Sequence, residues 1–348
     1  MSWWKFHVKT KVERMGDLKN DLGFSRVLVT GATGVAGPAL VNLLVEKGYC
    51  VRIFSRHCEG FDLFPKGVER FQGDLLDDRA LSMALKDVDG VFHLAAKLHD
   101  TKGLCHDDEF TLTNVKGTQT LVNMARGAGV KRFIFFSTIN VYGNCLKNDC
   151  FTETSPVNPQ DRYARSKLEA ENIVLAGAHN DPGGFAPVVL RMAAVYGKRI
   201  KGNYKTLILY LKNGGFLLLG SGVNLRTLIF DKDLAVAALL ALEHPGAPGQ
   251  IYNVTDGYIY SFNEIVFSIC DSLGRKTLFL KVPEKLVKLI LNLVNRTLCS
   301  RRLIQLSRMA EKQMESVAVS GKKLQTELGF LPRYGLDMGW REVVVKES

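Results

Sequence analysis

The chain has 348 residues, of which 46% are hydrophobic and 23% are charged, and 46 lysines and arginines against 35 acidic residues give it a net charge of +11. That composition excludes an intrinsically disordered chain, and the length fits one large domain or two of ordinary size. Seven scattered cysteines without a CxxC pair indicate free thiols in a reducing compartment rather than a disulfide framework or a metal site, and no apolar run is long enough to span a membrane. The positive charge leaves three partners open: nucleic acid, an acidic membrane surface or an anionic ligand.

Short β-branched runs alternate with helical patterns through the first half of the chain. Residues 1–25 precede them as a polar lead-in without the apolar stretch of a secretory signal. The expected strands cover residues 27–30, 51–55, 68–72, 91–94, 132–137 and 188–191. The expected helices cover residues 35–47, 78–87, 109–128 and 160–178. Because strands and helices at this spacing make a parallel sheet covered on both faces, we predict an α/β fold of the Rossmann type, with a doubly wound parallel sheet.

The alternation weakens after about residue 196. Here the patterns predict a short strand near 250–254 and helices near 203–213, 231–243, 262–273 and 284–298. We therefore expect residues 26–196 to form the Rossmann domain, with 226–256 returning to it, and residues 197–348 to form a smaller, mostly helical domain. No linker rich in Pro, Gly or Ser separates the two parts, so we expect them to pack closely.

A glycine-rich turn lies where the first expected strand passes into the first helix. The stretch from Thr30 to Gly37 has the sequence TGATGVAG. In this setting one glycine makes the tight turn, one lets the backbone approach a pyrophosphate, and one lets helix and strand pack closely, while the helix N-terminus offers free N–H groups to the anion. The residues expected to contact such a dinucleotide, NAD or NADP, are Gly31, Thr33, Gly34, Val35, Ala36 and Gly37.

The end of the second expected strand indicates which dinucleotide binds. An acidic residue there would bind the ribose 2′-hydroxyl, whereas an arginine accommodates a 2′-phosphate. Ser55 and Arg56 occupy this position, and no carboxylate follows until Glu59. The sequence therefore favours NADP over NAD, the alternative being that Arg56 is only solvated.

A tyrosine and a lysine stand four residues apart in the expected helix 160–178. Tyr163 and Lys167 would share one face of it, where a neighbouring ammonium favours the phenolate and lowers the tyrosine pKa from its usual value of about 10. The strand before this helix ends at Ser137 and Thr138, whose hydroxyls could hydrogen-bond a substrate carbonyl or alcohol oxygen. A YxxxK pattern alone is common on exposed helices, but together with a dinucleotide turn and a strand-end hydroxyl it indicates hydride-transfer chemistry.

Short motifs along the chain carry a resemblance to a known family. They are TGATGVAG at 30–37, GD at 73–74, HLAAK at 93–97, TNVKGT at 113–118, STINVYG at 137–143, YARSK at 163–167 and VLRMAAVYG at 189–197. With these motifs the chain resembles the extended short-chain dehydrogenase/reductase family, especially its NAD(P)-dependent epimerase/dehydratase branch, from about residue 26 to residue 343.

On the cofactor side, the resemblance implies roles for six residues beyond the glycine-rich turn. Asp74 and Leu75 match the pair that contacts the adenine. Asn114 matches the asparagine beneath the fourth strand. The segment that lines the central ribose and the phosphates matches Ala95, Ala96 and Lys97.

On the catalytic side, the resemblance assigns the reaction to four residues. Thr138, or else the adjacent Ser137, falls where the family's catalytic Ser/Thr lies. Tyr163 resembles the general acid/base, and Lys167 would hold the nicotinamide ribose and depress the tyrosine pKa. Thr138 and Tyr163 would also contact the substrate, which residues 197–348 would help to bind.

The substrate side of the resemblance points to nucleotide-sugar enzymes. The stretch NLRTLIFDKDLA at 224–235 resembles their segment whose arginine binds the substrate diphosphate, so Arg226 is the expected contact. The alternative for Arg226 is a surface pair with Asp231 or Asp233.

The sequence departs at two positions from a pattern found in many nucleotide-sugar epimerases. Where many nucleotide-sugar epimerases have the pattern RxxNxYGP, Ala194 stands in the asparagine position and Lys198 in the proline position. The chain is thereby nearer to sugar 4-ketoreductases and to 3β-hydroxysteroid dehydrogenase and dihydroflavonol reductase-like enzymes. These relatives use the same Tyr–Lys machinery on different substrates, because function follows the site and not the fold.

Most of the positive charge falls between residues 275 and 312, which hold ten Lys and Arg against two acids, a net charge of +8. Within this segment, residues 284–298 form an apolar stripe with basic edges, which fits either a buried core helix or a helix lying on an anionic membrane. The charge therefore points to an anionic substrate or to a membrane contact through 284–302. It points away from nucleic acid, for which the sequence carries no motif.

Three functions remain for comparison. The first is an NAD(P)-dependent oxidoreductase or epimerase that acts on a hydroxyl or keto group of a sugar, as part of a nucleotide sugar. The second is a 3β-hydroxysteroid dehydrogenase or dihydroflavonol reductase-like enzyme acting on a hydrophobic alcohol or ketone. The third is a non-enzymatic dinucleotide sensor, which would not need Tyr163 and Lys167 together. The family also implies a homodimer paired through helix 160–178, and the free thiols fit a cytoplasmic location with membrane association as an option.

Overall fold

The computed structural model describes residues 23–57, 59–98, 107–145, 150–178, 183–275, 278–283, 287 and 313–344. The expected lead-in at 1–25 and helix at 284–298 therefore lie almost wholly outside the described residues, as does most of the basic segment 275–312. Within these described ranges, no helix is long and apolar enough to cross a membrane.

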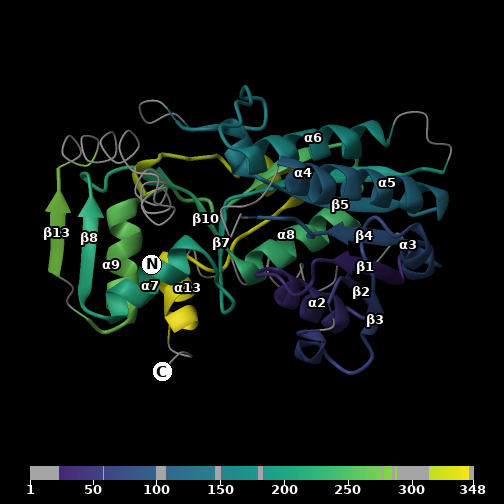
Figure 1. Cartoon of the computed structure of the whole chain (residues 1–348), viewed down its shortest axis with the longest axis horizontal. Coiled ribbons are helices and arrows are strands. Elements are labelled where there is room, and N and C mark those ends of the chain that lie inside the picture. The colour runs from purple at the N-terminus through teal and green to yellow at the C-terminus, as the bar shows by residue number, and fades with distance from the viewer. Residues whose placement is uncertain are drawn as a thin grey trace, which may run out of the picture.

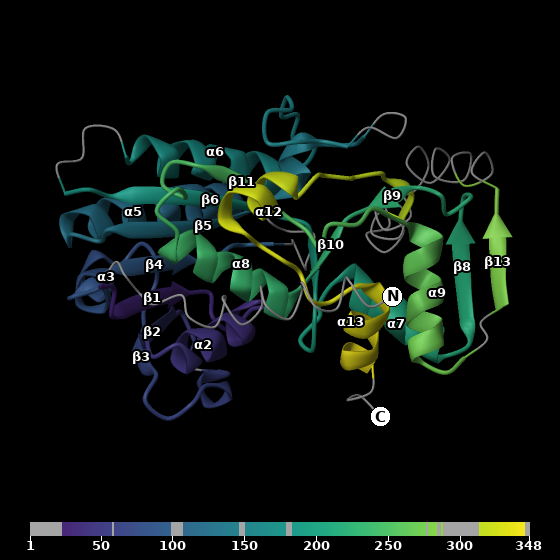
Figure 2. The same ribbon diagram turned by 180° about the vertical axis from the view of Figure 1, so that it is seen from behind.

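Seven parallel strands form one sheet in the order β11-β6-β5-β4-β1-β2-β3 (Figure 1; β6 and β11 are labelled in Figure 2). The strands are β1 (Arg26–Thr30), β2 (Cys50–Ser55), β3 (Glu69–Gln72), β4 (Gly90–His93), β5 (Arg132–Thr138), β6 (Ala186–Met192) and β11 (Ile251–Val254). β5 is buried at every residue, as a central strand covered on both faces must be. The order reverses between β1 and β4, which is the switch point where doubly wound sheets bind ligands at the carboxyl ends of their strands. The predicted Rossmann-type fold is confirmed.

Helices cover both faces of this sheet, as Figure 1 shows from one side and Figure 2 from behind. One face carries α2 (Gly37–Glu46) and α8 (Asp231–Glu243), and the other carries α3 (Asp78–Leu85), α5 (Gly117–Gly127) and α6 (Arg162–Ala176). Alternate side chains of β1 point to opposite faces of the sheet. Val27 and Val29 pack into the core under α2 and α8, and Leu28 packs into the core under α3, α5 and α6.

Two of the expected helices differ in detail from the sequence pattern. α2 begins at Gly37 rather than at residue 35, with Pro38 in its first turn, where the missing N–H of proline costs nothing. The helix expected over 109–128 consists of α4 (Asp107–Phe110), a π-helical turn η2 (Thr111–Lys116) and α5. Such π-turns are rare and often occur at functional sites, and η2 contains Asn114, one of the expected cofactor contacts.

After β6 the chain leaves the sheet and later returns to it. β11 pairs with β6, which places Asn253 opposite Arg191. α12 (Lys322–Leu328) packs Leu324 and Leu328 into the same core as α8. Segments that follow β6 in the sequence therefore complete one edge of the sheet.

The segments between these returns, together with α13 (Leu336–Val344) after α12, form a second lobe. Its short strands pair two by two: β7 (Ala194–Tyr196) with β10 (Leu228–Phe230), β9 (Leu225–Arg226) with β12 (Tyr260–Ser261), and β8 (Gly215–Leu219) with β13 (Leu278–Val282). Its helices are α7 (Asn203–Lys212), α9 (Phe262–Ser272) and α13 (Leu336–Val344). The ring of Tyr196 lies 4.6 Å from that of Trp340 and 5.2 Å from that of Phe230, so aromatic side chains form much of its core. Sequence patterns predicted the helices α7 and α9 but not these short strands.

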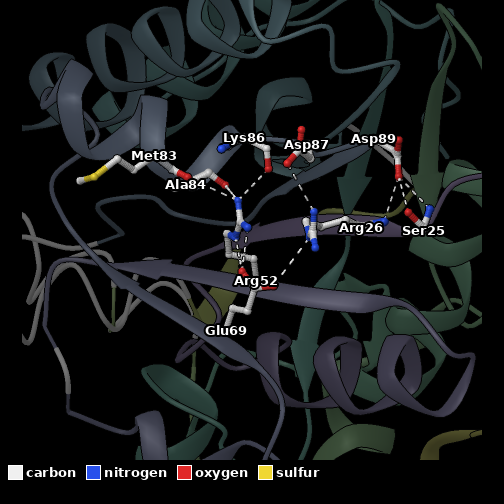
Figure 3. Close-up of polar contacts among 9 residues, drawn as sticks. All are labelled: Ser25, Arg26, Arg52, Glu69, Met83, Ala84, Lys86, Asp87 and Asp89. Atoms are coloured by element: carbon white, nitrogen blue, oxygen red, sulfur yellow. Dashed lines mark hydrogen bonds and ion pairs between the residues drawn. The ribbon is translucent and has the colours of Figure 1, made fainter.

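A network of hydrogen bonds and ion pairs lies at the amino-terminal edge of the sheet, beside α3 (Figure 3). Nη1 of Arg52 donates to the carbonyl oxygens of Ala84 at 2.6 Å and Lys86 at 3.0 Å, and Nη2 pairs with Glu69 at 2.7 Å. Asp89 accepts two main-chain N–H groups at the start of β1. A guanidinium that satisfies the last carbonyls of a helix stabilises its end, so these charged residues have structural partners. The carboxyl edge of the sheet is the one that carries the candidate site.

Candidate active site

The glycine-rich turn joins β1 to α2 at the carboxyl edge of the sheet. Gly31 has a φ of +70°, and a Cβ there would lie 2.5 Å from the main-chain nitrogen of Ala95, in the loop after β4. A Cβ on Gly37 would lie 1.9 Å from the carbonyl oxygen of Ala32, so only glycine lets α2 start this close to the turn. α2 has no side-chain cap at Ala36, which leaves its first N–H groups for an anion. The turn, which also contains Thr33, Gly34 and Val35, is therefore a cradle that fits the pyrophosphate of a dinucleotide.

Other expected cofactor contacts lie at the carboxyl ends of the neighbouring strands. Ser55 ends β2, and Arg56 is exposed just beyond it, with its carbonyl oxygen accepting a hydrogen bond from Gln72 at 3.1 Å. Beyond β3, Asp74 is exposed and Leu75 is buried. These residues lie along the same edge as the glycine-rich turn, where one extended dinucleotide could reach all of them.

Asn114 joins the loop after β4 to the helix that carries Tyr163 and Lys167. Its Oδ1 accepts the main-chain N–H of Lys97 at 2.7 Å, and its Nδ2 donates to the Lys97 carbonyl oxygen at 3.1 Å and to Ser166 Oγ at 2.9 Å. The Ser166 hydroxyl donates in turn to the carbonyl oxygen of Tyr163 at 2.8 Å. Asn114 is buried within the π-turn η2, and it holds the loop that contains Ala95 and Ala96 against α6.

A buried histidine that the sequence analysis left without a role lies beneath this loop. Nδ1 of His93 is 2.7 Å from Oγ1 of Thr30, and its Nε2 is 2.9 Å from Oγ1 of Thr118. Because Thr118 donates its own proton to the carbonyl oxygen of Asn114 at 2.6 Å, we assign the Nε2–H tautomer. Burial, and then the charge of Lys167, lower the pKa of His93 to about 3, so the ring is neutral at neutral pH. The HLAAK motif contains this residue, but only the fold brings the two threonines to it.

Tyr163 and Lys167 lie on α6 as their spacing predicts, but the pKa of the tyrosine shifts in the other direction. Burial, and then the charge of Asp161, raise the pKa of Tyr163, so the expected depression by Lys167 is wrong for the chain by itself. Lys167 is 1% exposed, and burial lowers its pKa to about 7. Its Nζ lies over the ring of Phe135, 3.9 Å from the centroid, in a cation–π contact. A further positive charge beside the phenol would be needed to reverse the shift.

The two strand-end hydroxyls have different surroundings. Ser137 is fully buried, and its hydroxyl donates to Oε1 of Glu171. Thr138 retains 7% exposure and accepts the main-chain N–H of Asn140 at 3.2 Å, which caps the turn that follows β5. Of the two residues, only Thr138 retains any exposure, and only the hydroxyl of Ser137 is bound to a carboxylate.

Glu171 and Arg191 form a buried ion pair that the sequence analysis missed. Nη2 of Arg191 on β6 lies 2.7 Å from Oε2 of Glu171 on α6, and both side chains are nearly inaccessible to solvent. The available signal was the position of Glu171, four residues after Lys167 and hence on the same helix face. Sequence alone could not supply its partner, because Arg191 lies on another element, strand β6.

Arg226, the expected diphosphate contact, lies in the second lobe. It is half-buried on β9, opposite Tyr260 of β12. Its positive charge lowers the pKa of the Tyr204 phenol, but burial of Tyr204 has the larger effect and raises that pKa. Asp233, one of its alternative partners, accepts the main-chain N–H groups of Arg333 and Tyr334. The role of Arg226 in substrate binding stays a prediction.

The sequence predicts neither a metal site nor a disulfide framework, and the structure bears on these expectations only for the described residues. Among the side chains described here, no three His, Cys, Asp or Glu residues come together as they would around a metal ion. Of the cysteines whose state is described, none forms a disulfide: Cys50, Cys145, Cys150 and Cys270.

Known proteins resemble this chain over nearly its whole length. The model of the NAD dependent epimerase/dehydratase family matches residues 27–255. A UDP-glucose 4-epimerase of Vibrio cholerae is 30% identical over 321 residues, which cover 91% of this chain and 93% of that protein. A 3-beta-hydroxysteroid dehydrogenase of Mycolicibacterium neoaurum is 30% identical over 286 residues, covering 78% of this chain and 77% of that protein. Among solved structures, MoeE5 in complex with UDP-glucose and NAD has a TM-score of 0.73 at 26% identity and covers 92% of this chain and 98% of its own.

Proposed function

The chain belongs to the NAD dependent epimerase/dehydratase family, and from that premise we propose that it is an NAD(P)-dependent oxidoreductase or epimerase of a nucleotide sugar, acting on a hydroxyl or keto group of the sugar. The observation that carries the proposal is the set of hydrogen bonds made by Asn114, which fixes the loop beside the dinucleotide turn against the helix of Tyr163 and Lys167. The UDP-glucose 4-epimerase relative and the UDP-glucose and NAD in MoeE5 support this substrate class.

In the proposed reaction, Thr138, Tyr163 and Lys167 have different roles. The dinucleotide, when bound, supplies the hydride acceptor or donor and, in its oxidised form, a positive charge beside the phenol. Thr138 hydrogen-bonds the reacting oxygen of the substrate. Tyr163 takes the proton of the substrate hydroxyl during oxidation and returns it during reduction. Lys167 holds the nicotinamide ribose, and its ammonium adds to the positive charge that favours the phenolate.

For the cofactor, we propose a preference for NADP over NAD. Arg56 is exposed at the carboxyl end of β2, and neither Ser55 nor His57 offers a carboxylate to a ribose 2′-hydroxyl. Fluorescence titration with NADPH and NADH tests this, and Arg56→Ala should weaken NADPH binding more than NADH binding. Tighter binding of NADH by the wild type would refute the preference.

A second candidate is an enzyme acting on a hydrophobic alcohol or ketone. Two observations favour it: the 3-beta-hydroxysteroid dehydrogenase relative, and the apolar Ala194 in β7, which packs against the aromatic core of the second lobe. The two candidates differ in what they bind. A thermal-shift panel with NADPH or NADH should show stabilisation by UDP-, GDP- or dTDP-sugars for the first and by steroids for the second. Two results together would refute the proposed mechanism. They are the absence of stabilisation by either nucleotide sugars or steroids, and full activity of Tyr163→Phe on any substrate found.

For the assembly, we propose a homodimer that pairs through α5 and α6. A surface cavity of about 440 Å³ lies between these helices, lined by residues that include Val122 and Ile173. Light scattering should give twice the chain mass for the wild type and a lower mass for Ile173→Glu. A monomeric wild type would refute the pairing.

For the location, we propose the cytoplasm; for residues 284–302, which apart from Val287 lie outside the described residues, a buried core helix is favoured and contact with an anionic membrane is the alternative. The free thiols support a reducing compartment. Co-sedimentation with liposomes, with and without anionic lipid, tests the membrane contact, and pelleting that does not depend on lipid would refute it.

A further inference from the structure

A buried ionic cluster links α6, the helix of Tyr163 and Lys167, to β5, β6, β11 and the turn that contains Tyr142. Glu171 on α6 accepts the hydroxyl of Ser137 on β5 and is held by Arg191 on β6, whose Nε lies 3.1 Å from Oε1 and whose Nη2 lies 2.7 Å from Oε2. Nη1 of Arg191 donates to the phenol oxygen of Tyr142 at 2.9 Å. That phenol donates to Oδ1 of Asn253 on β11, also at 2.9 Å.

Stability alone does not account for this cluster. Glu171 is 1% exposed and Arg191 is 4% exposed, and burying two charges costs about as much free energy as their attraction returns. Apolar side chains of similar size would often serve the fold equally well. The position of the carboxylate suggests another reason, because Glu171 lies one helical turn beyond Lys167.

Burial opposes the positive charge of Lys167, although the face of the Phe135 ring attracts it. The ring of Phe135 on β5 lies against Nζ, and His93 on β4 is neutral. Arg191 on β6 is itself positive and is paired with Glu171. Burial lowers the pKa of Lys167 to about 7, and the charge of Glu171 raises it against that loss.

We propose that Glu171 is a positioning residue whose fixed carboxylate keeps the side chain of Lys167 charged for the cofactor. Ser137 and Arg191 fix the carboxylate from two strands, so its distance from Lys167 does not vary as it would on an exposed helix face. This inference rests on the proposed role of Lys167. It goes beyond the Tyr–Lys–Thr set by assigning the protonation of the lysine to a residue that does not touch the substrate.

The test compares Glu171→Gln with the wild type in two assays. The first is a ¹³C NMR titration of protein labelled at lysine Cε, in which the resonance missing from Lys167→Met identifies Lys167. The second measures the dissociation constants of NADH and NADPH by fluorescence across the same pH range. In Glu171→Gln we expect the Lys167 midpoint to move to lower pH by about one unit, because an opposite charge nearby has been removed. The loss of cofactor affinity at alkaline pH should move with it.

Four further variants keep the test decisive. Glu171→Asp retains the charge and should restore most of the wild-type midpoint. Glu46→Gln removes the same charge from the exposed end of α2 and should change neither assay. If Glu171→Gln does not fold, the double variant Glu171→Gln with Arg191→Met is compared with Arg191→Met alone, and its Lys167 midpoint should be the lower of the two because only the carboxylate differs.

An unchanged Lys167 midpoint in a folded variant that lacks the Glu171 carboxylate would overturn the proposal, as would an equal shift in Glu46→Gln. Failure of the proposed function looks different. In that case the wild type binds neither NADH nor NADPH, while the NMR titration still reports whether Glu171 holds the charge of Lys167.

Discussion

Replacing Asn114 by alanine should separate the loop after β4 from α6. The side chain is 1% exposed and makes three hydrogen bonds of 2.7 to 3.1 Å, two to the main chain of Lys97 and one to Ser166. At about 1 kcal/mol for each hydrogen bond, the free energy of unfolding should fall by about 3 kcal/mol. Because the same bonds hold the cofactor-side loop to the helix of Tyr163, the affinity for NADH or NADPH should also fall, by about tenfold or ~1.4 kcal/mol.

Urea denaturation and fluorescence titration measure these two losses separately. Asn114→Asp is the sharper variant, since a carboxylate can still accept the N–H of Lys97 but can donate neither to the Lys97 carbonyl nor to Ser166. Asn42→Ala, on the exposed face of α2, is the matched control and should stay within about 0.5 kcal/mol of the wild type. A loss of stability below about 1 kcal/mol in Asn114→Ala, or unchanged cofactor affinity in a destabilised variant, would refute the reasoning.

Four other changes test separate parts of the structure. Gly37→Ala should lower the melting temperature far more than Gly127→Ala, because its Cβ would lie 1.9 Å from a carbonyl oxygen whereas a Cβ on Gly127 meets nothing within 4 Å. Tyr163→Phe should abolish turnover and leave the dissociation constant of NADH or NADPH nearly unchanged. Arg52→Met should lower the free energy of unfolding in urea by about 3 kcal/mol, because carbonyls at the end of α3 and Glu69 lose their partner, without changing cofactor affinity. Asp256→Asn should stabilise the protein more at about pH 8 than at about pH 4 in thermal melts. Burial raises the pKa of Asp256 in the folded chain to about 7, above the pKa of the same carboxyl in the unfolded chain. The stability that the protonated carboxyl gives the folded chain is therefore lost as the pH rises from the unfolded-state pKa to about 7.

The pKa values around α6 bear on how the proposed site would work. Tyr163 has a raised pKa and Lys167 a lowered one, so the chain by itself holds both groups closer to neutral than the reaction requires. Positive charge brought to this site by an oxidised dinucleotide would favour the phenolate. Glu171 would meanwhile keep the lysine charged, which is why its buried position beside Lys167 matters to the proposal.

Local patterns in the sequence determined most of the sheet and the position of the candidate site. The strand expected over 27–30 is β1 (Arg26–Thr30), and the helix expected over 231–243 is α8 (Asp231–Glu243). The glycine-rich turn and the spacing of Tyr163 and Lys167 were also readable. Each of these features depends on residues that are close in the sequence, such as apolar periodicity, a turn glycine or one helical turn.

The short strands of the second lobe could not be predicted in the same way. β9 and β12 have two residues each, and β7 and β10 have three, which is too short for an alternating pattern. They are strands only because a distant segment supplies their hydrogen bonds, as Tyr260 does for Arg226.

Only the tertiary structure decided which polar groups meet and how their protons are held. Asn114 and Ser166 are 52 residues apart in the sequence, and Ser137 and Glu171 are 34 apart, yet each pair is hydrogen-bonded. The sequence placed an ammonium one turn from Tyr163 and thereby predicted a lowered pKa. In the fold the side chain of Tyr163 is half-buried, and the loss of solvation around the phenol, followed by the charge of Asp161, raises its pKa instead, because solvation depends on every element packed around a side chain and not on its neighbours along one helix.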